Sequence, residues 1–251
     1  MIEPYYQHAG TTIYHGDCRD ILPHLEPVDL VLTDPPYSSG GMTRSDRNLK
    51  TSDKYVMTGT DLIRPEFSGD NRDQRSFLLW CELWMRDCLK LAKKGAVLAS
   101  FIDWRQLPTL TDAVQVAGWV YRGITVWDKT EAARPQKGWF RAQAEFLVLA
   151  SAGPLEVDRD GISSPGVFRY GITQSEKEHI TGKPVKLCFD IIRTTPKFQT
   201  ILDPFMGSGT TLVAAKQLCR EAIGIEIEEA YCAIAVRRLQ QEILPLTEVL
   251  A

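Results

Sequence analysis

Short apolar runs that fit β-strands alternate along this chain with segments whose apolar residues recur every three or four positions. The strand-like runs lie at residues 11–15, 29–33, 96–101, 121–127, 144–150, 199–202 and 222–227. The helix-like segments lie at residues 77–91, 107–117, 186–195, 210–220 and 229–243. We expect Lys93-Lys94-Gly95 to end the first of these helices. The alternation predicts an α/β fold with helices on both faces of a mostly parallel sheet, and residues 1–251 are enough for one such domain.

Two stretches of the chain lack this periodicity. Residues 38–75 are rich in Gly, Ser, Thr, Asp and Arg, and they contain seven Lys or Arg against six Asp or Glu. This stretch is longer than an ordinary connection, which predicts a long loop insertion with a function of its own. Residues 152–182 carry few apolar residues between Gly, Pro and Ser, and we expect a short variable segment there.

The composition of the chain excludes several classes of protein. Its apolar share of 44% and its charged share of 24% are globular, and its net charge of −3 excludes a strongly basic nucleic-acid coat. No apolar run approaches the roughly 20 residues of a membrane span. The first residues, Met1-Ile2-Glu3-Pro4, show neither a basic start nor an apolar run, so we do not expect secretion. The six cysteines form no Cys-x-x-Cys pair. We therefore expect reduced thiols, no metal site and a cytoplasmic protein without a membrane partner.

A glycine-rich turn follows the strand-like run at 199–202. The sequence Asp203-Pro204-Phe205-Met206-Gly207-Ser208-Gly209-Thr210-Thr211 leads directly into a helix-like segment. Glycines let the backbone pass close to a ligand, and the free N–H groups at a helix start favour a polar or anionic group. The next strand-like run ends in Glu226, 17 residues after Gly209. A carboxylate at that spacing typically accepts hydrogen bonds from ribose hydroxyls.

Two phosphate-binding motifs are excluded at this turn. The dinucleotide-binding fingerprint needs a glycine where the chain has Leu212, and the P-loop needs a lysine where Gly209 is followed by Thr210. A ribose-bearing cofactor without a large phosphate group fits the turn better. An ordinary strand–turn–helix connection that binds no ligand is the alternative.

A stiff corner, Asp34-Pro35-Pro36-Tyr37, follows the strand-like run at 29–33. Two prolines fix the backbone and remove two N–H donors, so the carbonyl groups stay free as acceptors. Asp34 presents a carboxylate at the carboxyl end of a strand, where open α/β sheets bind their ligands. The corner suits a flat heteroaromatic ring that stacks on Tyr37 and donates from an exocyclic amine to Asp34. A turn that Asp34 merely caps is the structural alternative.

These motifs together resemble those of the S-adenosylmethionine-dependent DNA amino-methyltransferases, which modify the N6 amine of adenine or the N4 amine of cytosine. Asp34-Pro35-Pro36-Tyr37 is similar to the family's catalytic motif, and the turn from Asp203 to Thr211 is similar to its cofactor motif. The catalytic motif comes first, as in the permuted β group. Gly16-Asp17-Cys18 and His179-Ile180-Thr181-Gly182-Lys183-Pro184 match two further motifs, so the resemblance spans residues 11–240. It implies a Rossmann-like class I methyltransferase fold.

The resemblance also implies the roles of individual residues. Glu226 would bind the ribose hydroxyls and Asp17 the adenine amine of S-adenosylmethionine, while Lys183 would lie near its methionine carboxylate. Cys18 could also be a core residue. The full cofactor-binding set that we expect is Asp17, Cys18, His179, Thr181, Lys183, Asp203, Pro204, Phe205, Gly207, Gly209, Thr210, Glu226 and Ile227. The expected catalytic set is Asp34, Pro35, Pro36 and Tyr37.

Double-stranded DNA is the partner that the resemblance implies, and a homodimer is compatible with it. Larger members of the family recognise their target with a long region, but the corresponding interval here, 152–178, has only 27 residues. Target contact would then fall to residues 38–75 or to residues 129–141, where basic residues flank Trp139. The expected DNA-binding residues are Arg44, Arg47, Lys50, Lys54, Lys129, Arg134, Lys137, Trp139 and Arg141. A solvated loop with a buried tryptophan is the alternative for residues 129–141.

The sequence therefore predicts a DNA methyltransferase that modifies the N6 amine of a flipped adenine. Asp34, where N4-cytosine enzymes more often have serine, favours adenine over cytosine. RNA or glutamine-amide methyltransferases usually have asparagine in place of Asp34 and carry the cofactor motif first. A cofactor-free subunit that only binds nucleic acid is the non-enzymatic alternative, and the intact motifs disfavour it.

Overall fold

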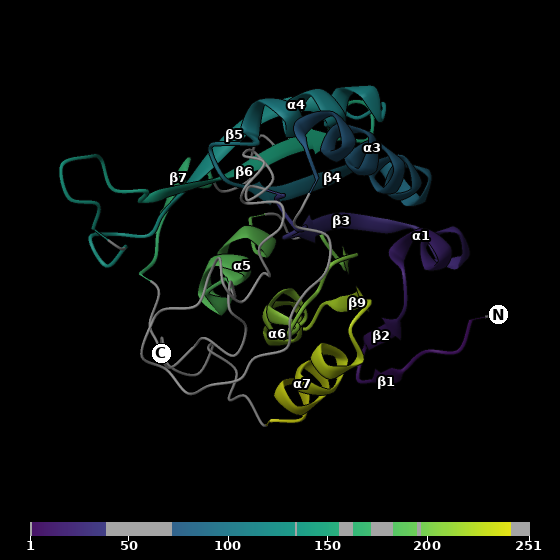
Figure 1. The fold of residues 1–251 in the computed structure, drawn as a ribbon. Coiled ribbons are helices and arrows are strands. Elements are labelled where there is room, and N and C mark those ends of the chain that lie inside the picture. The colour runs from purple at the N-terminus through teal and green to yellow at the C-terminus, as the bar shows by residue number, and fades with distance from the viewer. Residues whose placement is uncertain are drawn as a thin grey trace.

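A nine-stranded sheet forms the centre of the computed structural model, in the order β1-β2-β9-β8-β3-β4-β6-β5-β7 (Figure 1). The structure describes residues 2–38, 72–133, 135–155, 163–171, 183–194 and 197–241. Its strands are β1 (Tyr6–His8), β2 (Thr11–His15), β3 (Val28–Thr33), β4 (Ala92–Ile102), β5 (Val120–Asp128), β6 (Ala144–Ser151), β7 (Val167–Arg169), β8 (Thr200–Asp203) and β9 (Glu221–Glu226). Five neighbouring strands, β2, β9, β8, β3 and β4, are parallel, and β6 then runs antiparallel to both β4 and β5. The expected mostly parallel α/β sheet is confirmed.

Helices cover both faces of the sheet. They are α1 (Cys18–Ile21), the short 3-10 helix η1 (Leu22–His24), α3 (Gln74–Leu91), α4 (Leu107–Val116), α5 (Val185–Ile192), α6 (Thr210–Gln217) and α7 (Glu229–Gln240). In Figure 1, α3 and α4 lie on one side of β3 and β4, and α5, α6 and α7 lie on the other. Helix α1 shares the core of α3 and α4. Alternate residues of β3 divide between these layers, because Leu30 and Leu32 join the core under α5–α7 while Val31 joins the core under α3 and α4.

Helix α3 ends at Leu91, as expected, but β4 begins at Ala92 and not at Ala96, so Lys93-Lys94-Gly95 does not act as a separate helix stop. These three residues lie within β4, which follows α3 directly. Ala92 pairs with Val28 of β3, and the Gly95 N–H donates to the Ala152 carbonyl at 2.9 Å. Tertiary pairing in the sheet thus overrides a local composition that is typical of a helix end.

The sequence pattern missed four short elements. Strands β1 and β7 have three residues each and lie at the two edges of the sheet, and α1 and η1 occupy residues 18–24. Strand β7 falls within the stretch 152–182 that was expected to be irregular, where it pairs with β5 from Val126 to Asp128. Elements this short have no room to show a period. The two short strands become strands only through pairing with a neighbouring strand.

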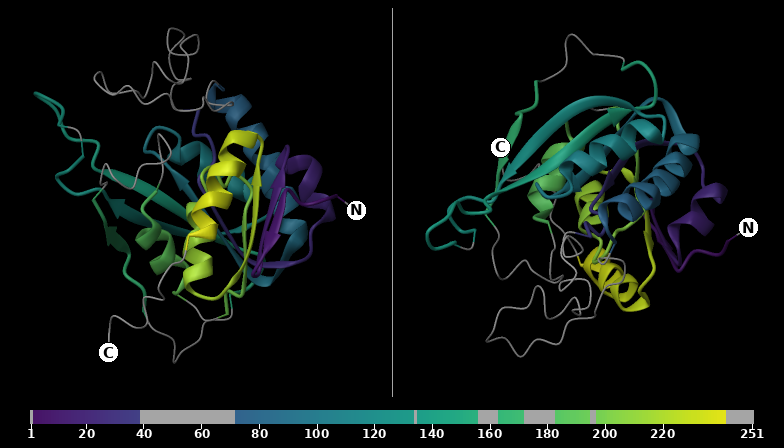
Figure 2. Two further views of the ribbon diagram at one scale, coloured as in Figure 1. Left: turned by 90° about the horizontal axis from the view of Figure 1, so that it is seen from below. Right: turned by 45° about the horizontal axis from the view of Figure 1, so that its top comes forward.

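A loop of residues 129–143 joins β5 to β6, and we call it the hairpin loop. Figures 1 and 2 show the segment between these strands extending away from the rest of the chain. None of the helices in the described part of the chain is long and apolar enough to cross a membrane. The described residues also contain no cluster of His, Cys, Asp or Glu that could hold a metal ion, and all six cysteines are free thiols.

Candidate active site

The Pro-Pro-Tyr corner and the glycine turn lie at the carboxyl ends of two adjacent parallel strands, β3 and β8. Thr33, the last residue of β3, donates its hydroxyl to Asp203 Oδ1 at 2.7 Å. The Phe205 N–H donates to the same Asp203 oxygen at 3.1 Å. One buried carboxyl group therefore joins the two motifs, which are 170 residues apart in the sequence. Asp203 is 3% exposed, so its carboxyl group holds the two motifs together from inside the protein.

Burial raises the pKa of Asp203 to about 7, although the hydroxyls of Thr211 and Thr33 oppose this shift. The folded protein therefore holds this proton more tightly than the unfolded chain, in which the pKa is near 3.8. The stabilisation from Asp203 is complete below pH 4 and is lost as the pH rises towards 7 and beyond.

We predict that Asp203→Asn removes this part of the pH dependence. The amide oxygen can still accept from Thr33 and Phe205, and no buried charge forms at high pH. As the pH rises from 5 to 8, the wild type should lose of the order of 2–4 kcal/mol of unfolding free energy that the variant keeps. Urea unfolding of both proteins at the two pH values measures the difference. If the unfolding free energies of the wild type and the variant change equally between the two pH values, Asp203 does not change its protonation state on folding.

The glycine turn is shaped by packing against α7 as well as by its place at the sheet edge. Gly209 is the N-cap of α6 with φ 81°, and a Cβ atom there would lie 2.8 Å from the Cβ of Ala235. Arg238, also on α7, donates from Nη1 to the Ser208 carbonyl at 2.8 Å and to the Thr210 hydroxyl at 3.2 Å. A glycine at position 209 is thus required by backbone conformation and by contact with α7.

Glu226 ends β9 and faces this turn. Its Oε2 accepts from the Gly207 N–H at 2.9 Å, and its Oε1 accepts from the Glu228 N–H at 2.9 Å. Burial raises the pKa of Glu226, and these two N–H groups act in the opposite direction. Each oxygen of a carboxylate has a second lone pair, so the group can accept two further hydrogen bonds from a ligand. The neighbouring Ile227 is 50% exposed and offers an apolar surface beside it.

Asp17 and Cys18 lie at the start of α1, next to the end of β9. Asp17 is the N-cap of α1, and its carboxylate accepts from the Arg19 backbone N–H at 2.9 Å and pairs with the Arg19 guanidinium at 2.5 Å. The hydrogen bonds from Arg19 lower the pKa of Asp17. Cys18 is 6% exposed, and burial raises the pKa of its thiol to about 12. Its side chain belongs to the core under α1 and α3, as the alternative for this residue predicted.

Two tryptophans that the sequence analysis did not select form the wall behind Phe205. The rings of Trp80 and Trp84 on α3 each lie 5.2 Å from the Phe205 ring, centroid to centroid. The Arg72 guanidinium lies 4.4 Å from the centroid of Trp80. Both tryptophans fit the apolar periodicity of the helix-like segment 77–91, so the sequence pattern did not distinguish them from other apolar residues of that helix.

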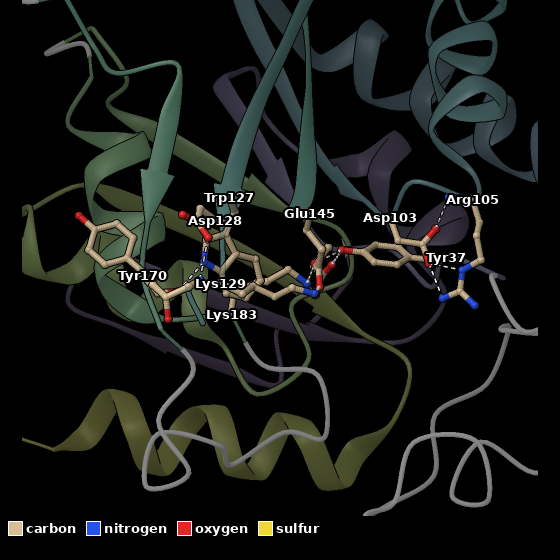
Figure 3. A network of polar contacts seen from close by, with 11 residues as sticks. Tyr37, Asp103, Arg105, Trp127, Asp128, Lys129, Glu145, Tyr170 and Lys183 are labelled. Carbon is tan, nitrogen blue, oxygen red and sulfur yellow. Dashed lines mark hydrogen bonds and ion pairs between the residues drawn. The ribbon is translucent and has the colours of Figure 1, made fainter. Parts of the chain in front are cut away.

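Asp34 contacts a partly buried network of charged groups. Figure 3 shows Tyr37, Lys129, Glu145 and Lys183 of this network. The Lys183 ammonium lies 2.6 Å from Asp34 Oδ2 and 3.3 Å from Glu145 Oε2. The Tyr37 hydroxyl donates to Asp34 Oδ1 at 2.6 Å and also lies 3.2 Å from Glu145 Oε2. Lys129 pairs with the other oxygen of Glu145 at 3.1 Å. Figure 3 shows Glu145 between the two lysines and Tyr37.

Opposite charges govern the ionisation of this network. Burial raises the pKa of Asp34 against the opposing effect of Lys183, so its carboxyl group is a better proton acceptor than an exposed one. Burial also acts to raise the pKa of Glu145, but the charges of Lys183 and Lys129 outweigh it and lower that pKa. Burial acts to lower the pKa of Lys183, but Asp34 and Glu145 together raise it. Two ammonium groups and two carboxylates therefore coexist in a charge-balanced cluster.

The Lys183 ammonium pairs with Asp34 and Glu145, and its contact with the cofactor carboxylate stays a prediction. Glu145 was missed by the sequence analysis. It occupies an alternating strand position on β6, opposite Trp127 of β5, and no local motif marks it. His179 and Thr181 lie outside the described residues, and so do Arg44, Arg47, Lys50, Lys54 and Arg134.

The hairpin loop presents two aromatic side chains to solvent. Trp139 is 70% exposed and Phe140 is 82% exposed, and their ring centroids are 5.6 Å apart. The alternative of a buried tryptophan at this loop is therefore wrong. Lys137 is exposed beside them, and Arg141 donates to the Glu131 carbonyl. Lys129 pairs with Glu145 at 3.1 Å, and its contact with DNA stays a prediction.

Comparisons with known proteins agree with this arrangement. The sequence profile described as DNA methylase, of the N6/N4 type, matches residues 28–237. The chain is 27% identical to the type II methyltransferase M2.LlaDCHI of Lactococcus lactis subsp. cremoris, over 96% of this chain and 93% of that protein. It is also 27% identical to the type II methyltransferase M.HinfI of Haemophilus influenzae, over 92% of this chain and 68% of that protein.

Solved structures share the fold. A crystal structure of the M1.HpyAVI–SAM complex superimposes with a TM-score of 0.66 at 24% identity, covering 92% of this chain and 100% of that chain. The PvuII DNA methyltransferase, described as cytosine-N4-specific, superimposes with a TM-score of 0.72 at 16% identity, covering 98% of this chain and 92% of that chain. The fold is that of the class I methyltransferases. With a profile match over most of its length and with both motifs at the carboxyl edge of one sheet, the chain belongs to the N6/N4 family of DNA methylases.

Proposed function

We propose that this DNA methyltransferase transfers a methyl group from S-adenosylmethionine to the N6 amine of an adenine that has been flipped out of the duplex. The observation that carries the proposal is the direct link between the two motifs. A carboxylate that can accept from an amine, Asp34, follows β3, and the glycine turn follows the adjacent strand β8. Asp203 joins them through Thr33 at 2.7 Å.

The groups around the glycine turn fit S-adenosylmethionine. Glu226 has free acceptor capacity for the ribose hydroxyls, and the exposed Ile227 provides an apolar surface for a purine ring. Phe205 is held by Trp80 and Trp84 at the other side of the turn. The set lacks a lysine or arginine in a P-loop position, which agrees with a cofactor that carries no phosphate. The related protein solved as a SAM complex supports the same cofactor.

The reaction that we propose depends mainly on positioning. S-adenosylmethionine supplies a methyl group on a positively charged sulfur, which is activated for transfer. Asp34 and the Pro35 carbonyl accept the two amine hydrogens, and this draws the amine nitrogen out of conjugation and aims its lone pair. The sulfur–methyl bond would break as the carbon–nitrogen bond forms, and its electron pair would stay on sulfur as a neutral thioether. The methylated nitrogen is acidic, and Asp34 or water takes its proton. The Tyr37 ring replaces the stacking that the flipped base has lost.

Adenine N6 is favoured over cytosine N4 by the residue at position 34. A carboxylate accepts an amine hydrogen more strongly than the hydroxyl of a serine, and burial keeps Asp34 a good proton acceptor by raising its pKa. The fold alone does not favour adenine over cytosine, because the cytosine-N4-specific PvuII enzyme shares it. The cytosine N4 amine is therefore the second candidate target.

Methyl transfer from radiolabelled S-adenosylmethionine tests the substrate class. Unmethylated plasmid DNA, total RNA and a protein extract are offered in parallel, and we expect label in the DNA alone. The labelled DNA is then hydrolysed to nucleosides and separated by chromatography. The label should migrate with N6-methyl-2′-deoxyadenosine. Label in RNA or protein would contradict the proposal, and label in N4-methylcytosine would support the second candidate.

The exposed tip of the hairpin loop is the described surface that we propose to contact DNA. We predict that replacing Trp139 and Phe140 together with alanine weakens DNA binding by about 5- to 150-fold, since base–aromatic stacking contributes roughly 1–3 kcal/mol. The salt dependence should stay unchanged, because no phosphate contact is lost. Fluorescence anisotropy with a DNA duplex across a salt series measures both quantities.

A matched comparison separates this tip from the long loop insertion. Replacing Arg44, Arg47 and Lys50 with alanine removes three charges from residues 38–75, for which DNA contact stays a prediction. That change should weaken binding and flatten the salt dependence. If the Trp139 and Phe140 double variant binds DNA like the wild type, the hairpin tip is not a contact surface.

A further inference from the structure

Lys183 and Tyr37 occupy the acceptor positions on Asp34 that the target amine would use. The Lys183 ammonium lies 2.6 Å from Asp34 Oδ2, and the Tyr37 hydroxyl donates to Asp34 Oδ1 at 2.6 Å. Under the proposed function, the amine has to donate to this carboxylate. Each Asp34 oxygen keeps a second lone pair, but an amine hydrogen that used it would lie beside the Lys183 or Tyr37 hydrogen of like partial charge. Exchange of a resident donor for the amine relieves this crowding.

A buried ammonium cannot leave one carboxylate without reaching another acceptor. The Lys183 side chain is 5% exposed, so water cannot solvate the charge if it loses Asp34. An unpaired buried charge is strongly unfavourable, and so is a buried hydroxyl without a partner. The exchange at Asp34 thus needs a second acceptor within reach of both the Lys183 ammonium and the Tyr37 hydroxyl.

Glu145 meets this requirement. Its Oε2 lies 3.3 Å from the Lys183 ammonium and 3.2 Å from the Tyr37 hydroxyl, so both donors on Asp34 already share it as their other acceptor. Lys129 holds the second Glu145 oxygen at 3.1 Å, which fixes the direction of the carboxylate. The three groups come from separate parts of the fold, because Glu145 lies on β6, Lys129 follows β5 and Lys183 precedes α5.

The rings around Lys183 make a short movement feasible. The ammonium lies 5.2 Å from the centroids of Tyr37 and Phe101 and 5.7 Å from that of Trp127. Aromatic faces attract a cation without a fixed direction, so the ammonium can shift between the two carboxylates and stay within attractive surroundings. Figure 3 shows Lys183 directed towards Glu145, beside Lys129.

We propose that Glu145 is a positioning residue that takes over the Lys183 ammonium and the Tyr37 hydroxyl when the target amine replaces them on Asp34. This role rests on the proposed function, since it requires Asp34 to bind the amine. Glu145 does not touch the reacting atoms and acts through Lys183 and Tyr37. Loss of its charge would disfavour the state in which the base is engaged, and the cofactor side of the site would be unaffected.

Glu145→Gln tests this role, because glutamine keeps the size of the side chain and removes its charge. We expect kcat with unmethylated plasmid DNA to fall at least about tenfold, since a buried ammonium would lose its alternative partner. The KM for DNA and the Kd for S-adenosylmethionine should stay within about twofold, because neither depends on the exchange at Asp34. Glu145→Asp restores the charge and should recover most of the lost kcat.

The matched control is Asp128→Asn, which removes another carboxylate from the β5–β6 pair. Asp128 pairs with Arg169 at 3.4 Å and does not touch Lys183, so its loss should leave kcat near the wild-type value. The inference is overturned if Glu145→Gln keeps wild-type kcat. It is also overturned if cofactor affinity and melting temperature fall in parallel with kcat, which would make Glu145 a purely structural residue. A wild type that methylates no DNA would overturn the proposed function together with this inference.

Discussion

Replacing Asp34 with alanine is expected to abolish methyl transfer to DNA, a loss of at least about 1,000-fold in kcat, because the amine loses the acceptor that orients it. The affinity for S-adenosylmethionine should change little, since Glu226 and the glycine turn lie on other strands and do not contact Asp34. Lys183 would still pair with Glu145, so the variant should fold. Isothermal titration with the cofactor and a methyl-transfer assay measure the two quantities on one preparation.

An isosteric variant sharpens the result for Asp34. Asp34→Asn keeps the shape of the side chain and one acceptor oxygen but cannot take a proton, so it should retain more activity than alanine and less than the wild type. If Asp34→Ala lowered cofactor affinity as much as activity, Asp34 would be a cofactor ligand. The Pro-Pro-Tyr corner and the glycine turn would then both serve to bind the cofactor.

Replacing Glu226 with alanine is expected to weaken S-adenosylmethionine binding by about 1.5–3 kcal/mol, or roughly 10- to 150-fold in Kd, because hydrogen bonds to a charged acceptor are lost. The change also removes the acceptor of the Gly207 and Glu228 N–H groups, so it loosens the turn as well. Isothermal titration measures the Kd, and the DNA affinity of the cofactor-free protein should stay at its wild-type value.

The neighbouring exposed Glu229 offers the matched control for Glu226. Glu229→Ala removes a charge from the first turn of α7 and should leave the cofactor Kd unchanged. Glu226→Gln keeps one oxygen as acceptor and should fall between the wild type and the alanine variant. An unchanged Kd for Glu226→Ala would remove this residue from the ribose site.

The elements that sequence predicts well here are those long enough to show a period. Helices α3, α4 and α6 and strands β2, β3, β5, β6, β8 and β9 lie where their apolar patterns indicated, with ends that differ by a few residues. The motifs at Asp34 and Gly209 were also found in advance, since turn chemistry is local. Strands β1 and β7 were missed because three residues cannot display an alternation, and only their neighbours make them strands.

The parts of the site that could not be predicted depend on tertiary contact. Glu145 is one carboxylate within an alternating strand, and its importance appears only when β6 is placed beside β4 and β5. Lys183 was selected from its motif, but the motif alone does not reveal that its ammonium reaches Asp34. Trp80 and Trp84 fit the buried face of α3, and that pattern does not show their contact with Phe205.

The adenine N6 target is tested most directly by reading the modified bases themselves. Unmethylated genomic DNA is incubated with S-adenosylmethionine and either the wild type or Asp34→Ala, and modified positions are then identified by single-molecule sequencing. We expect N6-methyladenine at one recurrent short sequence with the wild type and none with the variant. Modified cytosines in place of adenines, or an Asp34→Ala pattern equal to that of the wild type, would contradict it.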